Sequence, residues 1–326
     1  MISSTPIDPK PIIDYMHAVP FDVRPQALYT PFTLYEGFNP DKPESFHDCF
    51  DTRVYRHFID NGKHARTIEE SFSRVLHDYA IHLHLNRFFE SHDKLLCVGI
   101  MGGHALKRTD PMFRQIAFLA KRLTRMGFYM ITGGGPGAME ATHLGAWMAQ
   151  FLDEELDDAI NILSVAPDFT DPLWLATAFQ VITKYPQNKY ESLGIPTWLY
   201  GHEPSTPFAT HIAKLFENSI REDSILTMAF GGIIYTPGSA GTMQEIFQEA
   251  VQNHYLSFGF SSPMIFLGKQ FWTEEIPVYK FLTKLTKKGK YKNLILSATD
   301  QPEDVVVELI KFQHQANVYP DKFKFQ

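Results

Sequence analysis

Cysteine is scarce in this chain: its 326 residues include only Cys49 and Cys97, and no Cys-x-x-Cys pair occurs. The sequence therefore indicates neither a disulfide framework nor a zinc-thiolate site, and it suits a reducing compartment. It also lacks a run of about 18 apolar residues, the length that crosses a membrane. The N-terminus has no basic segment followed by an apolar run, as a secretory signal would have. We therefore expect a cytoplasmic protein without a membrane partner.

Basic residues are outnumbered by acidic ones, giving a net charge of −7. A general nucleic-acid binder needs clustered Lys and Arg to meet the phosphate backbone, so we expect no nucleic-acid partner. A small anion remains possible, because it needs only a few backbone N–H groups and one or two cations. We expect no metal site either. His82 and His84 are two residues apart on a predicted helix, which points their rings in different directions.

Apolar runs alternate with helical patterns from Lys94 onward. This predicts an α/β fold, a Rossmann-like doubly wound parallel sheet with helices on both faces, over residues 94–326. In such a sheet, ligands bind at the carboxyl ends of the strands. Strands are predicted at 94–101, 128–132, 161–167, 231–236, 262–268 and 293–300, and helices at 111–126, 136–150, 209–229, 243–256, 271–289 and 302–315.

Residues 1–93 form a separate, mainly helical or irregular N-terminal extension in this interpretation. A helix is predicted over 67–89, with its apolar residues on one broad face. The segment 168–207 is expected to be a long, irregular and functional loop. The face of the predicted helix consists of Phe72, Val75, Leu76, Tyr79, Leu83 and Leu85.

The first of two glycine turns is ITGGGPGAMEA, residues 131–141. Its three consecutive glycines, Gly133 to Gly135, allow positive φ and a close approach of the backbone to a ligand. The helix that begins near Gly137 offers free N–H groups and the positive end of its dipole, which suits phosphate. The pattern is neither Gly-x-Gly-x-x-Gly nor a Walker loop. A tight connection without a ligand remains the alternative.

The second turn is TPGSAGTMQE, residues 236–245. Its small residues supply compact backbone and one hydroxyl. Thr242 is a natural N-cap, and Thr-x-x-Glu can be a capping box in which Glu245 bonds back to the Thr242 N–H. A capping role and a catalytic role for Glu245 are both open at this point. If both turns flank one sheet edge, they form a crevice with two positive helix ends.

Together, GGGPGAMEA and PGSAGTMQE resemble the paired signatures of the LONELY GUY (LOG) family, long mislabelled as lysine decarboxylases. Members are Rossmann-type phosphoribohydrolases, which release the base and ribose 5-phosphate from nucleoside 5′-monophosphates. The resemblance covers roughly residues 94–315, and the first motif matches the larger, nucleotide nucleosidase-like branch. In the second motif, Pro-Gly-Gly-x-Gly-Thr-x-x-Glu, Ser239 replaces the middle glycine, while the other positions match: Pro237, Gly238, Gly241, Thr242 and Glu245.

The resemblance implies that Glu245 is the catalytic carboxylate and that Arg221, on the preceding helix, assists it. It also implies no cofactor, no metal and at least a homodimer, and it brings His202 and Glu203 near the site. The residues implied to bind the phosphate or nucleotide are Gly133, Gly134, Gly135, Gly137, Met139, Glu140, Pro237, Gly238, Ser239, Ala240, Gly241 and Thr242.

Two further expectations concern the chemistry. The dipole of its helix should keep Glu245 ionised, as stabilisation of a positive ribosyl transition state requires. Aromatic residues of the 168–207 segment should shape a base pocket, because aromatic faces stack on bases. These residues are Trp174, Tyr185, Tyr190 and Trp198.

Three other functions remain as alternatives. The first is a non-catalytic carrier of a nucleotide or of molybdenum cofactor on the same fold. The second is an amino-acid decarboxylase, which would need pyridoxal phosphate on a lysine, but no lysine lies in or beside either glycine turn. The third is a regulated or assembly protein that acts chiefly through residues 1–93.

Overall fold

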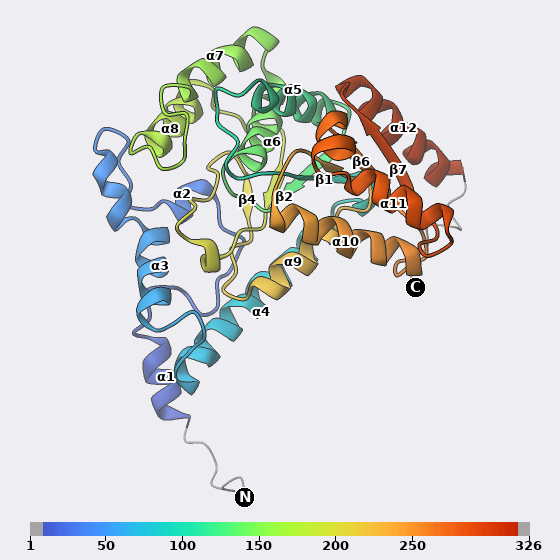
Figure 1. Cartoon of the computed structure of the whole chain (residues 1–326). Coiled ribbons are helices and arrows are strands. Elements are labelled where there is room, and N and C mark those ends of the chain that lie inside the picture. The colour runs from blue at the N-terminus through green and yellow to red at the C-terminus, as the bar shows by residue number, and fades with distance from the viewer. Residues whose placement is uncertain (1–8, 319–326) are drawn as a thin grey trace, which may run out of the picture.

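The computed structural model describes residues 9–318, so the first and last eight residues, including the start of the expected extension, lie outside this account. Within this range one seven-stranded sheet has the order β4-β3-β2-β1-β5-β6-β7, and every neighbouring pair is parallel (Figure 1). The strands are β1 (Cys97–Met101), β2 (Tyr129–Thr132), β3 (Ser192–Gly194), β4 (His211–Ile212), β5 (Gly232–Tyr235), β6 (Pro263–Leu267) and β7 (Ile295–Thr299).

Helices connect and cover these strands. The longer ones are α3 (Phe50–Asp60), α4 (Ile68–Glu90), α5 (Pro111–Arg125), α6 (Ala138–Trp147), α7 (Asp153–Leu163), α8 (Trp174–Lys184), α9 (Asn218–Leu226), α10 (Ala240–Tyr255), α11 (Val278–Lys287) and α12 (Pro302–Val318). Shorter ones are α1 (Lys10–Met16), α2 (Pro31–Leu34), η1 (Pro43–Asp48), η2 (Lys94–Leu96), η3 (Met148–Gln150), η4 (Trp198–Tyr200) and η5 (Phe271–Glu275).

The sheet buries both of its faces. Along β1, Cys97 and Met101 pack with residues of α3, α4, α9, α10 and α11, whereas Val98 and Ile100 pack with residues of α5, α6, α7, α8 and α12. This alternation follows from the two-residue repeat of a strand. Because both sides carry helices, the central strands β1, β2, β5 and β6 are buried throughout, and the predicted doubly wound α/β fold is confirmed.

Three sequence predictions of local structure are wrong. Residues 161–167 are not a strand: α7 extends to Leu163, since three acidic residues in its first turn favour a helix start and Leu156, Ile160 and Leu163 share its buried face. The segment 168–207 contains α8, β3 and η4 rather than an irregular loop. Within 209–229 only α9 is helical, and β4 precedes it. The sequence did not reveal β3 and β4, because strands of three and two residues are too short to show a hydrophobic period.

The N-terminal extension closes the edge of the sheet. The backbone groups of Tyr29 and Ile212 in β4 exchange two hydrogen bonds, at 2.9 and 2.7 Å, in an antiparallel bridge. Nearby, Asp51 of α3 accepts hydrogen bonds at 2.8 Å from both Lys214 Nζ and Trp198 Nε1, and all three side chains are buried. The edge strand therefore has a covering segment, and the extension shares one core with the sheet.

Helix α4 spans almost the predicted range, but the first half of its buried face is polar. Glu70, Arg74, His77 and Asp78 are buried, whereas most of the predicted apolar face is exposed. The reason is the partner of this helix: its inner face binds polar groups, including the N–H groups of Phe216 and Glu217. The predicted apolar face thus points mainly to solvent: only Leu85 of that set is buried, whereas five members are exposed, namely Phe72, Val75, Leu76, Tyr79 and Leu83.

Candidate functional site

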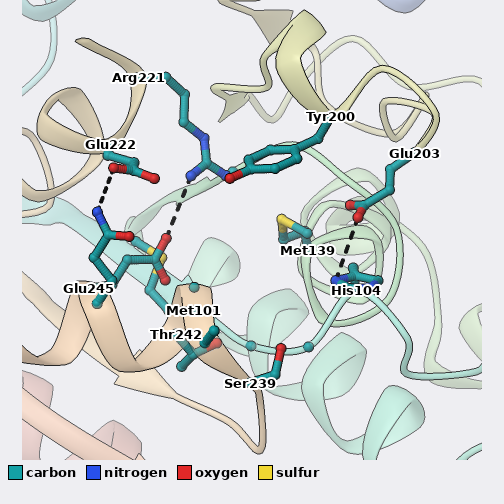
Figure 2. Close-up of a pocket in the computed structure, with 16 residues that line it drawn as sticks. Met101, His104, Met139, Tyr200, Glu203, Arg221, Glu222, Ser239, Thr242 and Glu245 are labelled. Atoms are coloured by element: carbon teal, nitrogen blue, oxygen red, sulfur yellow. Dashed lines mark hydrogen bonds and ion pairs between the residues drawn. The ribbon is translucent and has the colours of Figure 1, made fainter. Parts of the chain in front are cut away.

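A cavity of about 310 Å³ lies where β1, β2 and β5 end (Figure 2). Strand β1 is the point at which the strand order reverses, the position where open α/β sheets bind ligands. The cavity is lined by Met101, Gly102, Gly103, His104, Gly133, Met139, Tyr200, Glu203, Arg221, Glu222, Ser239, Ala240, Gly241, Thr242, Gln244 and Glu245.

Glu245 and Arg221 face each other inside this cavity (Figure 2). Arg221 Nη1 lies 3.8 Å from Glu245 Oε1, and both side chains are largely buried. A second contact fixes the arginine, because its Nε donates to the carbonyl oxygen of Ile195 at 3.0 Å. The guanidinium also occupies the space that a Cβ at Gly133 would need. The absence of a side chain at Gly133 therefore lets Arg221 lie between the two glycine turns.

Burial raises the pKa of Glu245 to about 7, although the Arg221 cation opposes this shift; the Glu222 carboxylate adds to it. The expectation that the helix dipole keeps Glu245 firmly ionised is therefore wrong, because desolvation outweighs it. Near neutral pH this carboxyl group exists in both protonation states. A group with such a pKa can accept and return a proton.

The N-terminus of α10 forms another wall. Its first backbone hydrogen bond runs from Met243 N to Ser239 O at 3.1 Å, so the N–H groups of Ala240, Gly241 and Thr242 have no acceptor among residues 9–318. Ser239 is the N-cap residue, and its side chain does not cap. Three such groups at the start of a sixteen-residue helix are an arrangement that suits an anion.

The capping-box alternative for Glu245 is not realised. Because α10 begins at Ala240, Thr242 already lies inside the helix rather than at its N-cap. Glu245 is in the second turn, and its carboxylate approaches Arg221 instead of the backbone of Thr242.

The first glycine turn contributes Gly133 and Met139 to the cavity, while its other glycines hold the turn in shape. Gly134 has a φ of +70°, its N–H donates to Thr132 Oγ1 at 2.9 Å, and its carbonyl oxygen accepts from Thr206 N at 2.8 Å. Gly135 N lies 3.3 Å from Met139 Sδ.

The N-terminus of α6 is less open than that of α10. Gly137 is its N-cap, and the next N–H, that of Ala138, donates to the carbonyl oxygen of Gly103 at 3.2 Å. Glu140 lies outside the cavity, where its buried carboxylate binds Arg108. The first N–H group of α6 is therefore bound to the loop after β1, whereas the first three of α10 have no acceptor within residues 9–318.

Pro237 and Gly238 likewise shape the second turn without lining the cavity. The carbonyl oxygen of Pro237 accepts a hydrogen bond from Gly103 N at 3.0 Å. This contact joins the loop after β1 to the loop after β5. The structure thus brings together eight of the residues expected to be catalytic or to bind phosphate: Gly133, Met139, Arg221, Ser239, Ala240, Gly241, Thr242 and Glu245.

Sequence reasoning missed the loop after β1 as part of the site. Gly102, Gly103 and His104 line the cavity, and the only signal was two glycines directly after an apolar strand. His104 Nδ1 lies 3.7 Å from Glu203 Oε1 (Figure 2). Glu203 is therefore at the site as expected, whereas His202 is 61 % exposed and does not line the cavity.

Glu222 was also missed as a lining residue. Its carboxylate accepts hydrogen bonds from Asn218 Nδ2 at 2.7 Å and from Gln244 Nε2 at 2.6 Å. The second of these joins α9 to α10 beside Glu245 (Figure 2). The Gln244 contact holds the helix that carries Arg221 against the helix that carries Glu245, whereas the Asn218 contact lies within α9.

The prediction that four aromatic residues of the 168–207 segment shape a base pocket is wrong. Trp174, Tyr185 and Trp198 are buried away from the cavity, and Tyr190 does not line it. Their segment is folded into α8, β3 and η4, which uses these rings for packing. Tyr200, at the end of η4, is the aromatic side chain that the segment supplies to the cavity.

Other kinds of site are less well supported. In the part of the chain that the structure describes, no group of three or more His, Cys, Asp or Glu side chains is arranged to hold a metal ion. Over the same residues, no helix combines the length and apolar character that a membrane crossing requires.

Comparison with known proteins adds little. No protein-family model matches the chain. No curated protein matches it. A solved structure, the molybdenum cofactor binding protein from the phototrophic bacterium Rippkaea orientalis, superposes with a TM-score of 0.41 at 16 % identity, over 66 % of this chain and 94 % of that one. That similarity is too low to define a ligand, and the fold assignment follows from the strand order itself.

Proposed function

We propose that this protein hydrolyses the N-glycosidic bond of nucleoside 5′-monophosphates to a free base and ribose 5-phosphate. The observation that carries the proposal is the buried Glu245 carboxylate, 3.8 Å from Arg221, in a cavity that also contains an open helix N-terminus. The helix end suits a phosphate, and the carboxylate suits a sugar that becomes positively charged. One small cavity thus offers both groups that a ribosyl phosphate needs.

The 5′-phosphate would bind the N–H groups of Ala240, Gly241 and Thr242 and the hydroxyl of Ser239. This fixes the ribose beside Glu245, because the phosphate and C1′ belong to one rigid sugar. Binding energy from the phosphate, which does not react, then assists the reacting carbon.

In the reaction, the bond between C1′ and the base nitrogen breaks, and its electron pair leaves with the base. Positive charge develops on C1′ and the ring oxygen, where ionised Glu245 stabilises it. Water attacks C1′, and Glu245 accepts its proton. That proton passes to the departing base, so the carboxylate is restored. Arg221 favours the ionised form of Glu245 and can contact the sugar hydroxyls.

The test is release of base from a panel of nucleoside 5′-monophosphates, with the matching nucleosides as controls. We expect release from the monophosphates, and a decrease of at least about 100-fold in Glu245→Gln. The matched control is Glu249→Gln. Glu249 is also buried on α10, burial likewise raises its pKa to about 7, and it lies outside the cavity.

Two results would overturn the proposal. Equal losses in both variants would mean that Glu245 has a structural role. No release of base by folded protein that binds a monophosphate would favour the carrier of a nucleotide or of molybdenum cofactor. A titration of adenosine 5′-monophosphate followed by calorimetry separates absent binding from absent chemistry.

We further propose that the protein acts in the cytoplasm as a homo-oligomer. Both cysteines are free and buried, which suits a reducing compartment.

A further inference from the structure

Helix α4 displays a stripe of apolar side chains to solvent. Its members are Ile68, Phe72, Val75, Leu76, Tyr79 and Leu83, each 40–61 % exposed. They recur at intervals of three and four residues, so they form one face of the helix. The opposite face is buried with its charged groups inward, as Glu70 and Asp78 show. The charged face of α4 thus binds the rest of the protein, and the apolar stripe on the other face is left exposed to solvent.

The area of this stripe matches an interface between two proteins. Large side chains present about 150–250 Å² each, so six of them at these exposures leave about 500 Å² of apolar surface. A stable interface of standard size covers about 800 Å² on each partner, a little more than half of it apolar. Ile220 of α9, 40 % exposed, enlarges the surface, because it lines a groove together with Val75 and Tyr79.

Charges at the two ends of α4 are arranged to complement a second copy in the opposite direction. Glu69 and Arg87 each lie nine residues from Asp78, and Arg66 and Glu90 each lie twelve residues from it. On helical spacing Glu69 and Arg87 flank the same edge of the stripe. Two α4 helices packed antiparallel about an axis near Asp78 would place Glu69 of one copy beside Arg87 of the other. Neither Glu69 nor Arg87 has an ion pair within residues 9–318.

We propose that the α4 stripe is the contact surface of a homodimer in which two α4 helices pack antiparallel across a two-fold axis. In this arrangement Val75, Leu76 and Tyr79 meet their equivalents at the centre. Each opposite-charge pair occurs twice, as two-fold symmetry requires. A parallel arrangement would leave Glu69 of one copy and Arg87 of the other at opposite ends of the interface, so this opposite-charge pair could not form. The dimer does not depend on the chemistry proposed for the cavity.

The first test is the mass of the full-length protein in solution, by sedimentation equilibrium across a dilution series. The chain has a mass of 37.4 kDa, and we expect twice this value for the wild type. Val75→Glu should raise the dissociation constant by at least about tenfold, since it places charge in the apolar centre. The matched control is Val307→Glu on α12, which has a similar exposure of 58 % and should remain dimeric.

The second test concerns direction and uses charge exchange. Glu69→Arg alone and Arg87→Glu alone should each weaken the dimer, and the double variant should restore it. A monomeric wild type would overturn the proposal, as would a Val75→Glu variant that still dimerises. If circular dichroism shows that all variants are folded and the double variant still does not dimerise as the wild type does, the antiparallel arrangement is overturned.

Discussion

The Asp78 carboxylate of α4 accepts a hydrogen bond from the backbone N–H of Glu217 at 2.8 Å, where α9 begins. It also accepts the N–H of Phe216. Because α9 carries Arg221, a residue of the N-terminal extension holds the helix that supplies a cation to the cavity.

We therefore expect Asp78→Ala to destabilise the protein by about 3 kcal/mol, since two buried N–H groups lose a charged acceptor. Urea unfolding measures this. The matched control, Asp60→Ala, removes an exposed carboxylate on α3 and should change the free energy of unfolding by less than about 0.5 kcal/mol. Equal effects of the two substitutions would show that Asp78 does not hold α9.

A second prediction concerns the pH dependence of catalysis. If Glu245 must be ionised, kcat/KM rises with pH through a midpoint near 7, the pKa of this residue in the free protein. In Arg221→Gln the midpoint should move to higher pH, because the cation that favours the ionised form is gone. The check is a pH–rate profile from pH 5 to 9 for both proteins. A midpoint that stays in place or falls would contradict the pairing.

A third prediction concerns stability. The pKa of Glu245 is raised from 4.5 to about 7 by folding, so the native state retains a proton that the unfolded state releases. Glu245 therefore lowers the free energy of unfolding progressively as the pH rises from about 4.5 to 7. Above that range the loss is about 3 kcal/mol. Glu245→Gln should be more stable than the wild type at pH 8 and equally stable at pH 4. Denaturant unfolding at the two pH values decides, and a variant less stable at pH 8 would refute this assignment.

A fourth prediction uses the contact between Arg221 and Gly133. In Gly133→Ala the new methyl group would occupy the position of the guanidinium, so Arg221 must leave it. We expect its loss of activity to equal that of Arg221→Ala, and the double variant to be no worse than either single one. Additive losses, measured as kcat/KM, would show that the two residues act separately.

Much of the architecture could be predicted from sequence, because central strands are apolar runs that end in glycine turns. Glu245 and Arg221 could be proposed from the resemblance, and the structure places them in one cavity. The pKa of Glu245 could not be predicted, since it depends on burial by residues distant in sequence. The buried face of α4 could not be predicted either. A helical period identifies an apolar face and a polar face, but it does not show which one the rest of the chain covers.

The contact between the N-terminal extension and the edge of the sheet also bears on how the chain folds during synthesis. Asp51 meets Lys214 across 163 residues of chain, and Asp78 meets Phe216 across 138. The extension leaves the ribosome before the sheet edge does, so Asp51 and Asp78 have these partners only once residues 214–217 have been made. The extension can therefore complete its contacts with the sheet edge only after these residues have been made. Contacts of such sequence separation slow folding.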